Sequence, residues 1–169
     1  MKALILIADG VEDSEFFYPY YRLQEEGIDV DVAGPDTGTV TGKHGYTFEA
    51  NLAFTGLKAD EYDLLILPGG KAPETVRLNA DAVKITTEMM NAGKPVAAIC
   101  HGAQTLISAG VLQGRKATCW AAIRDDIKSA GAEYADEEVV VDGNLVTSRS
   151  PGDLPAFCRR MFAAIKQTA

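Results

Sequence analysis

The sequence is poor in the basic residues that bind polyanions. It has 16 Lys and Arg residues against 24 Asp and Glu residues, which gives a net charge of −8 at pH 7 and a pI near 4.7. Nucleic acids and anionic membrane surfaces are bound by clustered basic side chains, so neither is an expected partner. No apolar run approaches the length that spans a bilayer. The sequence therefore predicts neither a nucleic-acid-binding nor a membrane protein.

Cysteine is also scarce. Cys100, Cys119 and Cys158 are odd in number, far apart and never in a CxxC pair. This usage predicts free thiols in a reducing cytoplasm and no zinc site. The apolar N-terminal stretch reaches Asp9 and Glu12 too early for a signal peptide and is better interpreted as a first strand. We therefore expect a cytoplasmic protein.

Phosphate-binding motifs are missing as well. The sequence contains no GxGxxG and no GxxxxGK[ST], so binding of a dinucleotide, or of phosphate by a P-loop, has no support. A flavodoxin-like order of elements is compatible with flavin, but no residues specify it. We therefore expect no cofactor and no metal.

Short apolar runs alternate with longer helical patterns along nearly the whole chain. Strands are expected at 3–8, 29–33, 63–68, 95–100 and 144–148, helices within 14–27, 81–93 and 153–167, and hairpins within 37–50 and 137–148, the latter turning at Asp142-Gly143. Strands that are apolar almost throughout suit a parallel sheet covered on both faces. The pattern predicts a single α/β domain over 1–169, a three-layer sandwich with a flavodoxin-like, mostly parallel sheet.

Three unusual segments follow expected strands. They are ADGVEDSE (8–15), LPGGKAPE (67–74) and ICHGAQ (99–104). The carboxyl ends of parallel strands lie on one edge of the sheet, where ligands bind. We therefore expect these three segments to meet at one site.

Cys100 occupies the place where a strand must turn abruptly into a helix, with Gly102 just beyond it. This order resembles a nucleophile elbow, although the GxSxG spacing is incomplete. A thiol at a helix N-terminus is expected to have a lowered pKa. The alternative is an ordinary buried cysteine, which is the usual fate of this residue type.

Other candidates surround this cysteine. His101 is adjacent to it, but neighbouring side chains at a sharp turn are expected to diverge, so its backbone N–H can serve an oxyanion while its imidazole meets an acid elsewhere. Among the acids of the first loop, Glu12 is the preferred catalytic carboxyl, because it follows the Asp9-Gly10 turn first. Gly69 and Gly70 can let the backbone approach a ligand and offer N–H donors. His44 is expected at the surface.

With these residues in place, the chain resembles the ThiJ/PfpI superfamily, and within it the PfpI-type branch of intracellular cysteine peptidases and deglycases. The resemblance runs almost end to end. It rests on ED-x-E at 12–15, GKHGY at 42–46, LPGG-x-xPE at 67–74, AICHG at 98–102, LISAGVLQGRKAT at 106–118, EVVVDGNLVTSR at 138–149 and PGDLPAF at 151–157.

The resemblance implies a role for each candidate. Cys100 is the nucleophile, Glu12 the carboxyl hydrogen-bonded to it, and Gly70 and His101 the oxyanion donors. Glu74 of a neighbouring subunit approaches His101, so the site is completed in a homo-oligomer, from a dimer up to a hexamer. Trp120 stands where relatives often have a tyrosine, which leaves substrate preference open.

Three functions remain. The preferred one is cofactor-independent, cysteine-dependent chemistry on small aldehydes such as methylglyoxal, or on their adducts with protein side chains, as in a deglycase or glyoxalase. The second is peptide hydrolysis by Cys100, His101 and Glu74. The third is a redox-sensing stress protein or chaperone in which Cys100 is oxidised.

Overall fold

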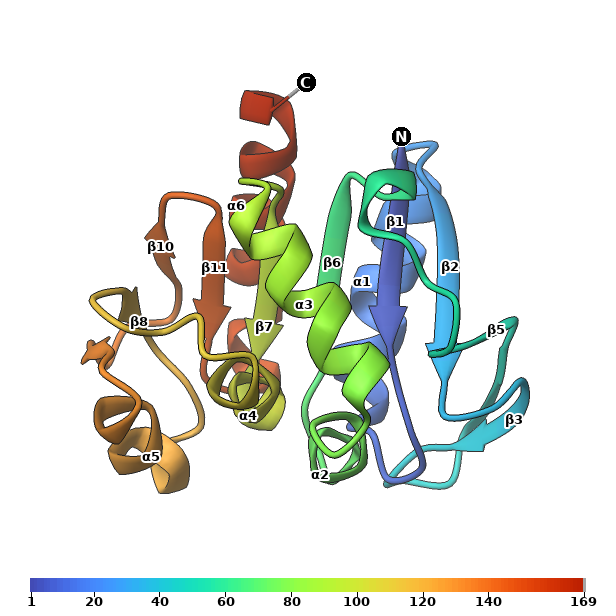
Figure 1. Ribbon diagram of the computed structural model, residues 1–169. Helices are drawn as coiled ribbons and strands as arrows, with labels where there is room; N and C mark the ends of the chain where they lie inside the picture. Colours follow the sequence, from blue (N-terminus) through green and yellow to red (C-terminus); the bar gives the residue numbers. More distant parts are fainter. Residues whose placement is uncertain (169) are drawn as a thin grey trace.

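A seven-stranded sheet forms the middle layer of the computed structural model, which describes residues 1–168 (Figure 1). Its strands, in spatial order, are β10 (Val140–Asp142), β11 (Leu145–Ser148), β7 (Val96–Ile99), β6 (Leu64–Leu67), β1 (Lys2–Leu6), β2 (Asp29–Gly34) and β5 (Leu52–Ala53). All neighbouring pairs are parallel except β10 and β11. The five predicted strands and the mostly parallel sheet are confirmed.

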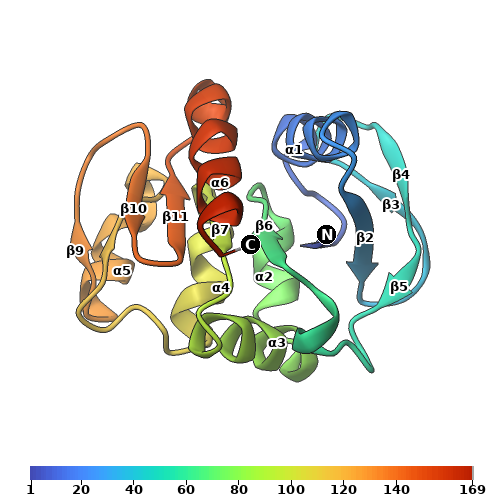
Figure 2. The ribbon, with the colours of Figure 1, turned by 90° about the horizontal axis from the view of Figure 1, so that it is seen from above.

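Helices cover both faces of the sheet. Seen from above, α1 (Asp13–Glu25) and α6 (Leu154–Thr168) lie together on one side, while α2 (Ala72–Val76), α3 (Ala80–Asn91) and α4 (Ala103–Ser108) lie on the other (Figure 2). The helix α5 (Arg124–Ser129) packs near the strand β9 (Glu133–Tyr134). Gly27 and Gly93, each with φ of 71°, follow the last turns of α1 and α3, as the sequence predicts. The three-layer sandwich is confirmed.

Two hairpins extend this frame. The strands β3 (Gly38–Thr41) and β4 (Thr47–Ala50) pair antiparallel, as predicted. In the second hairpin Asp142 pairs with Leu145, so Gly143 and Asn144 form the turn instead of Asp142 and Gly143. This displacement by one residue puts the glycine, with φ of 56°, at the first turn position. A short strand β8 (Lys116–Ala117) pairs with β9 outside the main sheet.

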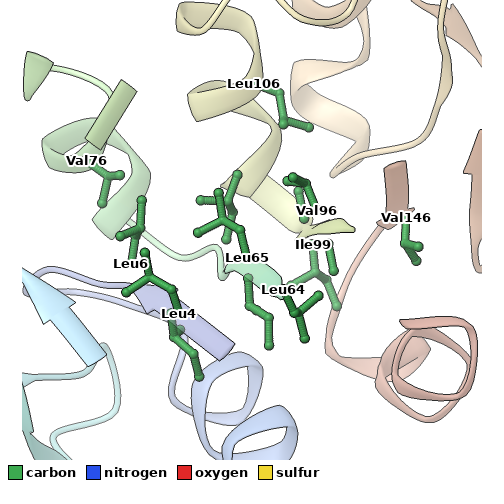
Figure 3. Close-up of a cluster of buried hydrophobic side chains, with 14 of the residues drawn as sticks. Leu4, Leu6, Leu64, Leu65, Val76, Val96, Ile99, Leu106 and Val146 are labelled. Atoms are coloured by element: carbon green, nitrogen blue, oxygen red, sulfur yellow. The ribbon is translucent and has the colours of Figure 1, made fainter. Parts of the chain in front are cut away.

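The core is built on the central strands. Leu4, Leu65 and Val96 are paired across β1, β6 and β7, and all three are fully buried (Figure 3). Each strand has helices on both sides, so consecutive residues are apolar instead of alternating with polar ones. Within residues 1–168, no helix combines the length and apolarity needed to cross a membrane.

The strand order also fixes the position of the site. Because β1, β6 and β7 are adjacent and parallel, their carboxyl ends lie side by side at the lower edge in Figure 1. The three unusual segments, which are far apart in the sequence, begin at these ends.

Leu65→Ala should lower the free energy of unfolding by about 2–5 kcal/mol, because it leaves a cavity in the centre of this core. The matched control is Leu78→Ala, since Leu78 is 86% exposed and its loss should change stability by less than about 0.5 kcal/mol. Urea unfolding of both variants measures the difference. Equal effects would contradict the placement of Leu65 in the core.

Candidate active site

Cys100 lies on a strained turn between β7 and α4. It opens the short 3₁₀ helix η2 (Cys100–Gly102), and its φ of 60° is the only left-handed value of a non-glycine residue among those the structure describes. Gly102 permits the turn, because a Cβ there would collide with the carbonyl oxygen of Leu67. The predicted strand–turn–helix elbow is present, and it holds the thiol in a sparsely populated backbone conformation.

A pocket of about 690 Å³ opens above the thiol. It is lined by residues of all three strand-end segments together with the β3–β4 loop and two later segments: Gly10, Glu12, Glu15, Lys43, Gly70, Lys71, Glu74, Cys100, His101, Trp120 and Pro151. Cys100 is 7% exposed. The fold thus gathers the predicted site residues around one buried cysteine.

The carboxyl beside Cys100 belongs to Glu15. Its side chain is fully buried beside the thiol, whose pKa it raises, whereas Glu12 pairs with His44 and Lys43 of the β3–β4 loop. The prediction that Glu12 contacts Cys100 is therefore wrong. Glu12 precedes α1 and lies at the mouth of the pocket, while Glu15 shares the buried face of α1 with Pro19 and Leu23. The spacing of four between these three positions was the sequence signal for Glu15.

Gly69 is the point where the site's components converge. A Cβ on this residue would lie 2.6 Å from Glu15 Oε2, 2.7 Å from Cys100 Cβ and 3.0 Å from the His101 nitrogen. Its own N–H donates to Glu15 Oε2 at 2.7 Å, and the other carboxyl oxygen, Oε1, is buried without a partner of its own in the described structure. Only glycine lets the thiol and the carboxyl approach this closely.

The carboxyl and the thiol both hold their protons strongly. Burial, with a smaller contribution from the charge of Glu12, raises the pKa of Glu15 to about 8. Burial and the charge of Glu15 raise the pKa of Cys100 to about 12, against the opposing effect of the Gly70 and His101 N–H groups, which point at the sulfur. The predicted lowering of the Cys100 pKa is wrong, because desolvation outweighs the dipole of the six-residue helix α4.

The two groups titrate as a pair. When the pair has lost one proton, the charge resides mainly on the Glu15 carboxylate, because the pKa of Glu15, about 8, lies well below that of Cys100, about 12. The site therefore places a carboxyl that ionises near neutral pH beside a thiol that keeps its proton, and the Gly70 and His101 N–H groups stabilise the thiolate once that proton is removed.

The imidazole of His101 does not diverge from the thiol as expected. Its Nδ1 lies 3.3 Å from Cys100 Sγ, because the left-handed backbone at Cys100 turns the two neighbouring side chains toward each other. Burial lowers the pKa of His101, so the ring is neutral at pH 7 and can accept a proton. Sequence reasoning directed the imidazole to an acid and did not predict this contact with the thiol.

Glu74 and Trp120 lie at the rim of the pocket. Glu74, in the first turn of α2, acts on His101 through its charge, which favours the protonated ring. No hydrogen bond joins them within the described chain. The Trp120 ring centroid is 6.2 Å from that of His101, and its backbone N–H donates to the Cys100 carbonyl at 3.3 Å. The indole thus forms a wall of the pocket, at the place predicted for it.

Glu12, Asp13 and His44 form a second polar cluster, with potential ligand atoms within 4.8 Å of one another. Their polar atoms already have partners. Asp13 accepts the backbone N–H groups of His44 and Tyr46, and Glu12 Oε1 lies 3.0 Å from His44 Nε2. The cluster therefore fastens the β3–β4 loop to the start of α1, and we assign no metal to it.

Comparison with known proteins places this site in a family. The model of the DJ-1/PfpI family matches residues 1–164. The chain belongs to the DJ-1/PfpI family. It is 59% identical over 166 residues to a deglycase of Thermococcus kodakarensis and 55% identical over 166 residues to Deglycase PfpI of Pyrococcus furiosus, in each case over 98% of this chain and 100% of the relative.

A solved structure of the same family has a closely similar fold. It is a two-domain protein of Anabaena variabilis with DJ-1/ThiJ/PfpI-like and ferritin-like domains. The TM-score is 0.96 at 42% identity, over 98% of this chain and 48% of that one. The agreement covers the whole strand and helix frame that positions Cys100.

The other two cysteines of this DJ-1/PfpI chain lie apart from the pocket lining. Cys119 and Cys158 are buried free thiols, and burial raises the pKa of each to about 12. Neither thiol lines the pocket through which a substrate could reach Cys100, which favours a structural role for both.

Gly69→Ala should disrupt the site, because the added methyl group meets Glu15, Cys100 and His101 at once. We expect a loss of about 1–3 kcal/mol in unfolding free energy and a changed rate of Cys100 alkylation. Gly152→Ala is the matched control, since a Cβ at Gly152 meets no atom within 4 Å. If the two variants behaved alike, the convergence at Gly69 would be refuted.

Glu15 should make stability depend on pH. Its pKa is raised to about 8, so the folded state binds a proton that the unfolded chain releases near the ordinary glutamate pKa of 4.5. The free energy of unfolding should therefore fall as pH rises from about 5.5 to about 8.5, by on the order of 3 kcal/mol.

Glu15→Gln should remove this fall, because glutamine keeps an acceptor for the Gly69 N–H but cannot ionise. Glu61→Gln is the control, since its 53% exposed side chain leaves Glu15 intact. Urea titrations at the two pH values measure the effect. A pH dependence that survives in Glu15→Gln would assign it to other groups.

Proposed function

We propose that the chain is a cofactor-independent, cysteine-dependent enzyme that acts on reactive dicarbonyls or on their protein adducts, as a deglycase or glyoxalase does. The observation that carries the proposal is the buried Glu15 carboxyl, with a pKa of about 8, held against the Cys100 thiol. A carboxyl tuned to neutral pH is suited to move protons on a carbon skeleton. The two relatives named deglycases support the same chemistry.

The first step is attack on the aldehyde. The Cys100 thiol gives its proton to the neutral His101 ring, and the sulfur forms a bond with the aldehyde carbon of methylglyoxal. The carbonyl oxygen becomes an oxyanion, which the N–H groups of Gly70 and His101 stabilise because they already point at the reacting sulfur. Protonated His101 then gives its proton to this oxyanion, and the product of the step is a thiohemiacetal on Cys100.

The second step moves a proton between adjacent carbons. Ionised Glu15 takes the proton from the former aldehyde carbon, and its carboxyl returns a proton to the neighbouring ketone carbon through an enediol. The first carbon is thereby oxidised to a thioester and the second is reduced to an alcohol, so no external electron carrier is required. Water then hydrolyses the thioester, and methylglyoxal plus one water gives lactate.

The same steps can repair an adduct. When the dicarbonyl is bound to a Cys, Lys or Arg side chain, its bond to that side chain breaks as the Cys100 sulfur bonds to the same carbon, and the resulting thiohemiacetal passes through the thioester to the 2-hydroxy acid. The freed side chain leaves with its proton. The pocket of about 690 Å³ opens to the surface at its charged rim, which is compatible with a reacting group carried on a polypeptide.

A comparison of Cys100→Ala with wild type tests the proposal. Turnover of methylglyoxal and of a methylglyoxal-treated peptide should fall by at least about 10³-fold, because the nucleophile is lost. Cys158→Ala, at a buried thiol away from the pocket, is the matched control and should retain turnover. Glu15→Gln should lose turnover far more than it loses iodoacetamide reactivity. Undiminished turnover in Cys100→Ala would exclude the mechanism.

Peptide hydrolysis is the second candidate function. The approach of His101 Nδ1 to within 3.3 Å of the thiol favours it, since a thiol–imidazole pair is the core of a cysteine peptidase. The third member would be Glu74 of a neighbouring subunit in a homo-oligomer, because Glu74 of the same chain is exposed at the rim. Cleavage of unmodified peptide by wild type but not by Cys100→Ala would select this function.

A further inference from the structure

The catalytic pocket has little apolar surface. Apart from Cys100, the described residues that line it with apolar side chains are Trp120 and Pro151, and the other lining residues are glycine, acidic, basic or His101. Pro151 is exposed and belongs to a segment that the chemistry at Cys100 does not use. An apolar part of a substrate therefore has two side chains to pack against in this pocket.

Pro151 and the oxyanion donor Gly70 lie on opposite sides of the reacting thiol. Gly70 follows β6 and Pro151 follows β11, and these two strands flank β7, which ends just before Cys100 (Figure 1). Ser148, the last residue of β11, is paired with Ile99, the last residue of β7. The two segments therefore leave the sheet at the same level, and Pro151 comes from the side away from the Gly70 N–H.

This arrangement orients a dicarbonyl of the form R–CO–CHO. The aldehyde carbon bonds to the Cys100 sulfur, its oxygen is directed to the Gly70 N–H, and both carbonyl carbons must lie within reach of Glu15. The substituent R is the part of the substrate that these groups do not use, and it is also the apolar part. It is therefore directed to the side of the pocket where Pro151 lies.

The segment that carries Pro151 is closed by an ion pair between Arg149 and Asp153, which we call the Arg149–Asp153 clamp. The guanidinium donates from Nε to Oδ2 at 2.9 Å and from Nη2 to Oδ1 at 3.0 Å, and the Arg149 backbone N–H donates to Oδ2 at 3.1 Å. Asp153 is 6% exposed, and its own N–H donates to the Ser150 carbonyl at 2.9 Å. A two-pronged pair fixes geometry better than a single contact, so the clamp holds Pro151 in one position.

A further contact of the guanidinium lies at the surface. Its Nη1 donates to Asp136 Oδ1 at 3.0 Å, and the Asp136 side chain is 72% exposed. Exposed ion pairs contribute little, so the buried Asp153 carboxylate is the partner that holds the clamp. The two acids thus provide a matched pair of positions for a test.

We propose that Pro151 contacts the substituent of the dicarbonyl and determines which substituents are accepted, and that Arg149 and Asp153 position it. This inference rests on the proposed function, and it specifies the substrates as dicarbonyls with a short apolar substituent, in preference to glyoxal, which has none. Arg149 and Asp153 are positioning residues, because they do not line the pocket and act through Pro151.

The series glyoxal, methylglyoxal and ethylglyoxal tests the proposal, because its members differ by one carbon in R. The substituent preference is kcat/KM on each alkylated compound divided by kcat/KM of the same protein on glyoxal. Pro151→Gly should lower this preference by about threefold for methylglyoxal and by more for ethylglyoxal, through a higher KM, since burial of one carbon contributes about that factor. Gly152→Ala is the matched control and should retain the preference, because a Cβ there meets no atom within 4 Å.

Variants of the clamp test the positioning role. Asp153→Asn keeps the shape of the side chain but loses its charge, and Arg149→Lys keeps a charge but loses the fork, so each should lower the substituent preference. Asp136→Asn removes the exposed partner alone and should retain it. A merely structural role would reduce turnover of all three dicarbonyls alike and leave the preference unchanged. Urea midpoints of all variants show that each is folded under the assay conditions.

The outcomes are distinguishable. An unchanged preference in Pro151→Gly, with all three dicarbonyls still consumed, would overturn the inference and leave the proposed function standing. Failure of wild type to consume any of them would overturn the proposed function and this inference with it. If Pro151→Gly changed the mass in sedimentation experiments together with the preference, Pro151 would be a contact between copies of this chain, and the inference would be wrong. A preference retained in both Asp153→Asn and Arg149→Lys would remove the positioning role.

Discussion

The structure of the site depends on one close approach, that of a buried carboxyl to a buried thiol across Gly69. Glu15 is 0% exposed and Cys100 is 7% exposed, so neither group can rely on water to carry its charge. Each group must therefore use the other and the nearby backbone N–H groups, and their pKa values rise together. A proton that is held strongly and shared at short range is what a cofactor-free isomerisation requires.

The sheet makes this approach possible. The segments that carry Glu15, Gly69 and Cys100 follow β1, β6 and β7, which are neighbours in the sheet but far apart in the sequence. The fully buried leucines and valines of those strands hold the three carboxyl ends at fixed spacing. The strain at Cys100, with its φ of 60°, is maintained by this packing, because the turn cannot relax without displacing Gly102 from Leu67.

The sequence predicted the arrangement of strands and loops better than it predicted the side-chain contacts within the site. Apolar runs gave the five predicted strands, and the rule that parallel strands end at one edge brought the correct three loops together. The choice of Glu12 or Glu15 as the carboxyl beside the thiol depended on which face of α1 is buried. The two acids are only three residues apart, and one faces the pocket mouth while the other is buried. The pairing of His101 with the thiol depended on a single φ angle, which composition and spacing do not specify.

Glu12 keeps a place in the site even though it does not contact the thiol. Its carboxylate links the β3–β4 loop to α1 through His44, and Glu12 lines the pocket above Cys100. One acid of the first loop is thus buried for proton transfer, and another stays at the mouth, where it shapes what can enter. The short segment after β1 thereby supplies both the buried carboxyl beside Cys100 and the carboxylate at the mouth of its pocket.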